Sequence, residues 1–322
     1  MPQSADEGGQ IGTIRELYRY VWRTSARHQI ALSALAVAVF LLELAPLELQ
    51  RRIVNRAVEG DGFRLIALLC LIYLAVVLVQ GGLKLVLNVY LGSVGEAASL
   101  RLRTDEKLLA VARSEERNGA EEQGVAISVI VSEVEAVGGF VGTAFSEPVL
   151  NGGILLSIFG YMLVVQPLLA LVAVALFIPQ VLFVPILQAA INRRTARRIK
   201  TLRSVSVDIV GQAEKGGGMS EATYRERIAD VYRLNMQIYR RKFFMNFLMN
   251  LLHHLGIVGI LFVGGWLLLN GVTDAGTIVA FISGLTRMND PWNDLVDFFR
   301  NLMNAGVKFR LIAGVLKQDP AG

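Results

Sequence analysis

Six apolar stretches, each long enough to cross a lipid bilayer, constrain the fold of this chain more than any other feature. A membrane-spanning helix needs about 20 apolar residues. The hydrophobic share of 53% and the charged share of only 18% set the chain apart from soluble domains, in which about a quarter of the residues are charged. The sequence therefore predicts an all-α membrane protein with six transmembrane helices, at residues 29–50, 63–91, 138–165, 167–191, 243–269 and 277–299.

The connections between these stretches alternate between tight turns and long charged segments. Gln166-Pro167 and residues 270–276 are tight turns, whereas residues 92–137 and 192–242 contain no proline and are compatible with helix throughout. We expect each long loop to form two antiparallel helices. The 51 residues of the second loop would then extend roughly 35 Å beyond the bilayer.

The basic residues indicate the orientation. Of the 32 Lys and Arg residues, 26 fall in residues 1–29, 92–137, 192–242 and 298–322, so the positive-inside rule places both termini and both long loops in the cytoplasm. The exceptions are Arg51, Arg52, Arg56 and Arg64, in or beside the first outer loop. We expect a multi-pass protein of the cell membrane, of the bacterial inner-membrane type, with the lipid bilayer and not nucleic acid as the partner of its basic residues.

The N-terminal region does not have the pattern of a signal peptide. Residues 1–10 are polar and acidic and are expected to form a disordered tail. The next residues alternate an apolar face with an Arg-rich face, which predicts a helix lying in the membrane interface. The alternative is that they simply begin the first span. The apolar face consists of Ile14, Leu17, Tyr18, Val21 and Trp22.

Polar side chains within the spans are the candidates for substrate contact, because their burial in lipid is costly. Asp290, Asp294, Asp297 and Asn301 recur at helical spacing and give the sixth span an acidic face, and Arg287 could neutralise Asp290. The alternative for each residue is hydrogen bonding or ion pairing between helices. The other candidates for a substrate pathway are Glu43, Lys84, Asn88, Glu147, Asn250 and His253, with Asn151 close to Glu147.

Two further classes of site have no support in the sequence. Cys70 is the single cysteine, so the chain cannot form an internal disulfide. His253 and His254 are adjacent and point apart on a helix, and no third ligand is spaced to join them, so we expect no metal site. No group of residues indicates a catalytic centre.

The far ends of the two long loops have a similar layout. Gly216, Gly217 and Gly218 interrupt the helical pattern of the second loop, and Arg113–Gly124 has a comparable Gly-containing end. We interpret the two ends as one docking face, with two unrelated solvated turns as the alternative. The residues expected to contact a partner are Glu115, Glu116, Arg117 and Asn118 in the first loop, and Glu214, Lys215, Gly216, Gly217, Gly218 and Met219 in the second.

This layout resembles the transmembrane half of exporter-type ATP-binding-cassette transporters. The most specific match is residues 264–281, Gly-Gly-Trp-Leu-Leu-Leu-Asn-Gly-Val-Thr-Asp-Ala-Gly-Thr-Ile-Val-Ala-Phe, and Pro291 and residues 305–312 also fit. The resemblance covers residues 11–316 and leaves residues 317–322 as a C-terminal tail. It implies an N-terminal elbow helix, six spans, and coupling helices at the loop ends that dock on a nucleotide-binding domain. The segment Glu214-Lys-Gly-Gly-Gly departs from the family's Glu-x-x-x-Gly pattern.

The resemblance implies a transmembrane subunit that moves a substrate by alternating access. A dimer is required, homodimeric by default, because six spans do not enclose a pathway in this fold. The chain contains no Gly-x-x-x-x-Gly-Lys-Ser/Thr motif to bind phosphates. No cofactor is therefore expected in this chain, and ATP and Mg are expected on a separate nucleotide-binding protein. Truncation of the sequence and loss of ATP coupling are the alternatives, and a competing function is an ATP-independent channel, regulator or assembly scaffold.

Overall fold

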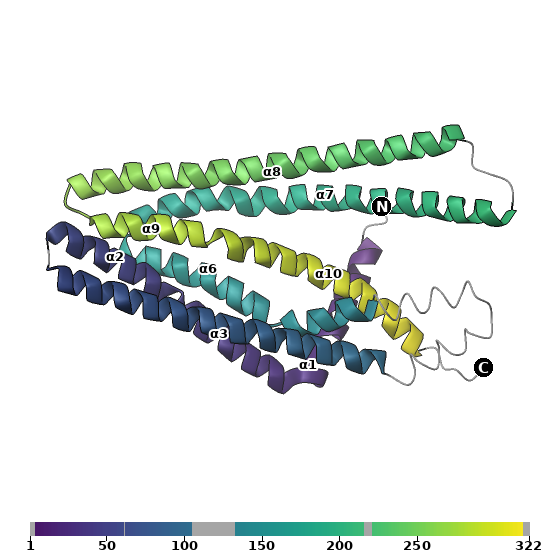
Figure 1. Ribbon diagram of the computed structural model, residues 1–322, viewed down its shortest axis with the longest axis horizontal. Coiled ribbons are helices and arrows are strands. Elements are labelled where there is room, and N and C mark those ends of the chain that lie inside the picture. Colours follow the sequence, from purple (N-terminus) through teal and green to yellow (C-terminus); the bar gives the residue numbers. More distant parts are fainter. Residues whose placement is uncertain (1–3, 61, 105–132, 216–220, 318–322) are drawn as a thin grey trace. The chain divides into compact units, whose positions relative to one another are not determined.

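A computed structural model describes residues 4–60, 62–104, 133–215 and 221–317 (Figure 1). All regular secondary structure in these residues is helical, as predicted. Residues 133–143 are also helical. The labelled helices are α1 (Ser4–Leu42), α2 (Leu44–Glu59), α3 (Phe63–Arg103), α6 (Ser146–Val165), α7 (Pro167–Lys215), α8 (Glu221–Leu269), α9 (Ala275–Arg287) and α10 (Asn289–Lys317).

Five helical segments within the described residues are long and apolar enough to cross a membrane. They are Gly12–Glu59, Phe63–Arg103, Ser146–Val165, Pro167–Ile199 and Glu221–Leu269. These segments contain the first five predicted spans in whole or in large part. The chain therefore has the composition and the helix lengths of a membrane protein.

Proline residues account for the places where the predicted spans are interrupted. Proline lacks the backbone N–H of a helical hydrogen bond, and its ring clashes with the carbonyl of the residue four positions earlier. Pro46, Pro148 and Pro291 are each the third residue of a helix, in α2, α6 and α10. The preceding helical segment ends four or five residues before each proline, at Leu42, Thr143 and Arg287.

Three predicted spans differ in this way from single straight helices. The sequence predicts one helix over residues 29–50, but the helix is interrupted at Glu43 between α1 and α2. The predicted span 138–165 contains a turn at Ala144 and Phe145 before α6 begins. The predicted span 277–299 is divided at Met288 into the 13-residue α9 and the charged start of α10, and neither part is among the five long apolar segments.

The N-terminal helix has one irregular residue. α1 begins at Ser4, within the stretch predicted to be a tail, and its backbone leaves helical geometry at Ser25, with φ −142° and ψ 24°. Before this kink, Leu17 and Val21 are fully buried, whereas Trp22 is half exposed. The ring of Tyr18 makes edge-to-face contacts with Phe140 and Phe145. The predicted apolar face therefore packs partly against the protein itself.

The chain forms two compact units. The first contains residues 1–165 and 274–322, and the second contains residues 166–273. In the first unit α2 packs against α9 and α3, and α1 packs against α6, α3 and α10. Glycine residues allow the closest approach: a Cβ on Gly142 would lie 2.5 Å from the carbonyl oxygen of Leu91, and one on Gly138 would lie 1.9 Å from Ser99 Oγ.

The second unit is a pair of helices, α7 and α8, which pack side by side along their length (Figure 1). Each has 49 residues, which corresponds to about 73 Å at 1.5 Å per residue. Pro167 is the first residue of α7, where its missing N–H has no helical partner to lose. The bounds of α7 and α8 are Lys215 and Glu221 on either side of the glycine run, which lies outside the described residues.

Candidate functional site

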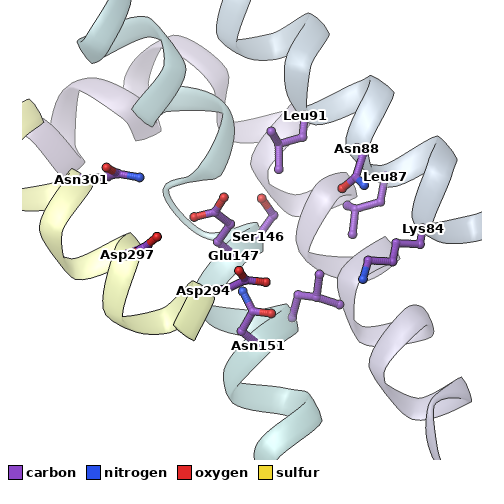
Figure 2. Close-up of a pocket in the computed structure, with 11 residues that line it drawn as sticks. Lys84, Leu87, Asn88, Leu91, Ser146, Glu147, Asn151, Asp294, Asp297 and Asn301 are labelled. Carbon is purple, nitrogen blue, oxygen red and sulfur yellow. The ribbon is translucent and has the colours of Figure 1, made fainter. Parts of the chain in front are cut away.

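A polar cavity of about 450 Å³ lies between α3, α6 and α10 in the first unit (Figure 2). Lys84, Asn88 and two leucines face it from α3, and three polar residues face it from α10. Figure 2 shows the polar side chains of the three helices converging on the same space. The full lining is Lys84, Leu87, Asn88, Leu91, Ser146, Glu147, Leu150, Asn151, Asp294, Asp297 and Asn301.

The turn before α6 and the break before α10 place the acidic groups. Glu147 is the second residue of α6, directly before Pro148. Asp294 and Asp297 follow Pro291 on α10 by one and two helical turns, at the spacing that puts side chains on one helix face. The charges of Asp294 and Asp297 both act on Glu147. The acidic stripe predicted for the sixth span therefore lines a cavity at Asp294, Asp297 and Asn301.

The cavity contains both paired and unpaired charges. Asp297 accepts an ion pair from Arg300 at 2.9 Å, with both side chains about half exposed. Lys84 reaches in from α3, and its charge acts on Asp294. Glu147 has no ion-pair or hydrogen-bond partner among the described residues. Carboxylates in such a place require a compensating positive group or water, because burial of an uncompensated charge is costly.

Glu43 and Arg287 form a second polar cluster, at the break between α1 and α2 and the break between α9 and α10. Arg287 Nη1 lies 2.5 Å from Glu43 Oε1, and Gln80 donates to the other oxygen of the same carboxylate. The side chains of Glu43 and Arg287 are 15% and 26% exposed. The sequence offers Asp290 as a residue that Arg287 could neutralise, but the guanidinium pairs with Glu43, 244 positions away between α1 and α2. Asp290 is exposed and does not line the cavity.

A third cluster involves three of the four arginines that are exceptions to the positive-inside rule. Arg51 and Arg52 both pair with Glu48, and Tyr161 Oη donates to Glu48 at 2.9 Å. Arg56 pairs with Glu59. These arginines therefore lie beside acidic partners on α2, so their positive charge is offset locally.

Asp274 connects this cluster to the start of α9. Its carboxylate accepts a hydrogen bond from the backbone N–H of Thr277 at 2.6 Å and caps the helix. Arg51 lies 3.4 Å from its other oxygen. Partial burial acts to raise the pKa of Asp274, but hydrogen bonds from Thr277 and Asn55 and the charge of Arg51 outweigh it, so the pKa lies below its ordinary value.

Several predicted site residues lie elsewhere. Asn250 and His253 are on α8, in the second unit, and do not line the cavity. Of the predicted partner-contact residues, 115–118 and 216–219 lie outside the described residues, and Glu214 and Lys215 are at the end of α7. No group of three His, Cys, Asp or Glu residues with metal-binding geometry occurs in the described part of the chain.

Sequence reasoning missed two contributors to these clusters. Gln80, which donates to Glu43, lies in an apolar helix 37 positions away in the sequence. Ser146, which lines the cavity, donates its hydroxyl to the carbonyl of Gly142 at 3.2 Å. Two signals were available for Ser146: serine is common at the start of helices, and Pro148 follows two residues later, as the third residue of α6.

Comparison with protein-family models gives no match, and comparison with curated proteins gives none either. The function of the chain is therefore inferred from the geometry of its helices and cavity.

Proposed function

We propose that the chain is the transmembrane subunit of an exporter-type ATP-binding-cassette transporter. In this proposal it works as a dimer, homodimeric by default, and moves its substrate by alternating access. A separate nucleotide-binding protein supplies the energy of ATP hydrolysis, with ATP and Mg bound to that partner. The cavity between α3, α6 and α10 is the substrate site.

The helix pair α7–α8 is the observation that carries the proposal. Each helix is about 73 Å long, whereas the hydrocarbon core of a bilayer is about 30 Å thick. The apolar parts of the two helices lie at the N-terminal end of α7 and the C-terminal end of α8, and the parts nearest residue 218 are rich in charge. A helix pair of this length can transmit a force applied outside the membrane to the segments within it.

Two finer features of the layout belong to the same proposal. α9 and α10 together would form a sixth span, divided at Met288, with the polar cavity on its inner side. The part of α1 before the kink at Ser25 would form the elbow helix at the cytoplasmic interface, with the half-exposed Trp22 toward the headgroups. Aromatic residues with a polar edge favour that position.

The proposal is tested by purifying the tagged chain from membranes of the cells in which it occurs naturally, and by identifying any ATPase that co-purifies. The ATPase activity of the reconstituted complex is then compared between the intact chain and a variant lacking Lys215–Gly218. We expect the deletion to reduce stimulation of the partner ATPase at least tenfold, because it removes part of the segment predicted to contact the partner.

The matched control changes the opposite end of the same helix pair. Replacement of Val272 and Thr273 by alanine, in the turn after α8, should leave stimulation within twofold. Size-exclusion chromatography must show that both variants keep the oligomeric state of the intact chain. Absence of any ATPase partner, or unchanged stimulation after the deletion, would favour an ATP-independent channel, regulator or scaffold.

A further inference from the structure

The cavity between α3, α6 and α10 has an excess of negative charge. Three carboxylates and one ammonium group line it. Arg300 offsets Asp297, and Lys84 acts on Asp294, which leaves Glu147 without an ion-pair partner among the described residues. The excess therefore equals about one unit charge when all these groups are ionised.

A buried amide in the same wall lacks a partner. Asn151 is only 4% exposed, and its carboxamide makes no hydrogen bond to the described residues. It lines the cavity, and Figure 2 shows its side chain directed into the space beside Asp294. Its amide carries both donors and an acceptor, so it can hydrogen-bond to a polar group that enters the cavity.

The volume of the cavity and the apolar part of its lining limit the kind of ligand that can carry this polar group. A volume of about 450 Å³ falls in the range of small-molecule sites, about 300–1,000 Å³. Leu87, Leu91 and Leu150 supply apolar wall. An inorganic cation would not fill this volume or contact leucines, and the described residues contain no cluster with metal-binding geometry.

We propose that this cavity binds a monovalent organic cation, which has an ammonium or amidinium head, a small apolar body and one hydrogen-bonding group. Glu147 and Asp294 hold the positive head, Asn151 binds the polar group, and the leucines contact the apolar body. The inference rests on the proposed function, because it names the substrate class of the cavity assigned there to the substrate.

Equilibrium binding to the intact chain tests this proposal without ATP or a partner. The chain is purified in an uncharged detergent, and binding of tyramine and of choline is measured by titration calorimetry, with benzenesulfonate as an anion of similar size. We expect saturable binding of at least one of the two cations and none of benzenesulfonate. Saturable binding of neither cation, or equal binding of the anion, overturns the proposal.

Three variants locate the site. Glu147→Gln should weaken cation binding at least tenfold, because it removes the uncompensated charge. Asp290→Asn is the matched control, since Asp290 is an exposed carboxylate on the same helix as Asp294 but outside the lining, and it should change binding less than twofold. Lys84→Met should strengthen binding at least threefold, because it removes a competing positive charge.

Glu147→Gln and Lys84→Met are expected to change cation binding in opposite directions, which separates an effect on binding from an effect on folding. If the Glu147→Gln protein does not fold, the Lys84→Met protein still tests the proposal. Lys84 is exposed, and a structural disturbance at this position would not strengthen cation binding. Equal effects of Glu147→Gln and Asp290→Asn, or weaker binding in Lys84→Met, overturn the proposal. Cation binding by a chain that has no ATPase partner would retain the site and reject the proposed transporter, whereas a coupled partner without cation binding would do the reverse.

Discussion

At the scale of single residues, three prolines lie beside helix breaks at which charged groups occur within apolar segments. Pro46, Pro148 and Pro291 each follow a helix break, and the breaks place Glu43, Glu147 and Arg287 beside them. Each break frees backbone carbonyls from helical hydrogen bonds. In a continuous helix the carbonyl of Ala144 would accept a hydrogen bond from the N–H of residue 148, which proline lacks. Here Tyr18 Oη donates to the carbonyl oxygen of Ala144 at 3.4 Å.

The pairing of Glu43 with Arg287 gives a testable stability difference. Both side chains are mostly buried, and removal of one member of a buried pair costs about 3–5 kcal/mol because the other charge is left uncompensated. We expect Arg287→Met to lower the thermal unfolding temperature in detergent strongly, and Glu43→Gln combined with Arg287→Met to recover part of that loss. Thermal unfolding followed by tryptophan fluorescence measures both.

The control for this comparison is an exposed pair on the next helix. Arg300 and Asp297 are 44% and 55% exposed, and exposed pairs contribute about 0–1 kcal/mol. Arg300→Met should therefore change the unfolding temperature little. A similar loss in Arg287→Met and Arg300→Met would show that the Glu43–Arg287 pair does not stabilise the fold.

At the scale of the helical elements, the contact between α3 and residues 133–143 depends on glycine. The spacing of Gly138 and Gly142 permits close helix packing, although such pairs are common in membrane helices. The structure places both against the backbone or side chains of α3, at Leu91 and Ser99. Leu91 also lines the cavity, so this contact holds one of the cavity walls, α3, against residues 133–143.

Alanine substitution tests this contact. A Cβ on residue 142 would lie 2.5 Å from a backbone carbonyl oxygen of α3, which cannot move without displacing the helix. We expect Gly142→Ala to destabilise the protein by about 1–3 kcal/mol, the usual cost of overpacking, as measured by thermal unfolding. Gly139→Ala is the matched control, because its Cβ would meet no atom within 4 Å and alanine favours helix. Equal stability of the two variants would contradict this packing.

The sequence predicts the elements better than it predicts the partners of their polar residues. Apolar length locates the helices, and the helix ends at Val165 and Leu269 follow from proline and glycine signals. The division of the predicted sixth span was foreseeable from Pro291, but apolar content alone favoured a continuous helix. The partner of Arg287 was not predictable, because helical spacing identifies neighbours on one helix and not a residue 244 positions away in the sequence.

At the scale of the whole molecule, the distribution of charge agrees with the lengths of the helices. The helix pair α7–α8 carries 13 of the 32 basic residues in residues 192–242, at the end of each helix that contains the fewest apolar residues. The turn between α8 and α9 contains Asp274 and no basic residue. Arg51 and Arg52, at the same end of the first unit as Asp274, are offset by Glu48 and Asp274.

This asymmetry predicts which ends of the helices face the cytoplasm. Cys70 is first replaced by serine to remove the only native thiol, and a single cysteine is then introduced at Gly217 or at Val272, beside Asp274. Since basic loops stay on the cytoplasmic side, a membrane-impermeant maleimide should label the Val272→Cys protein in intact cells and the Gly217→Cys protein only after the membrane is made permeable. Labelling of both in intact cells, or the reverse pattern, would exclude the proposed orientation, and labelling of neither after permeabilisation would show that the turn and the loop are not exposed to water.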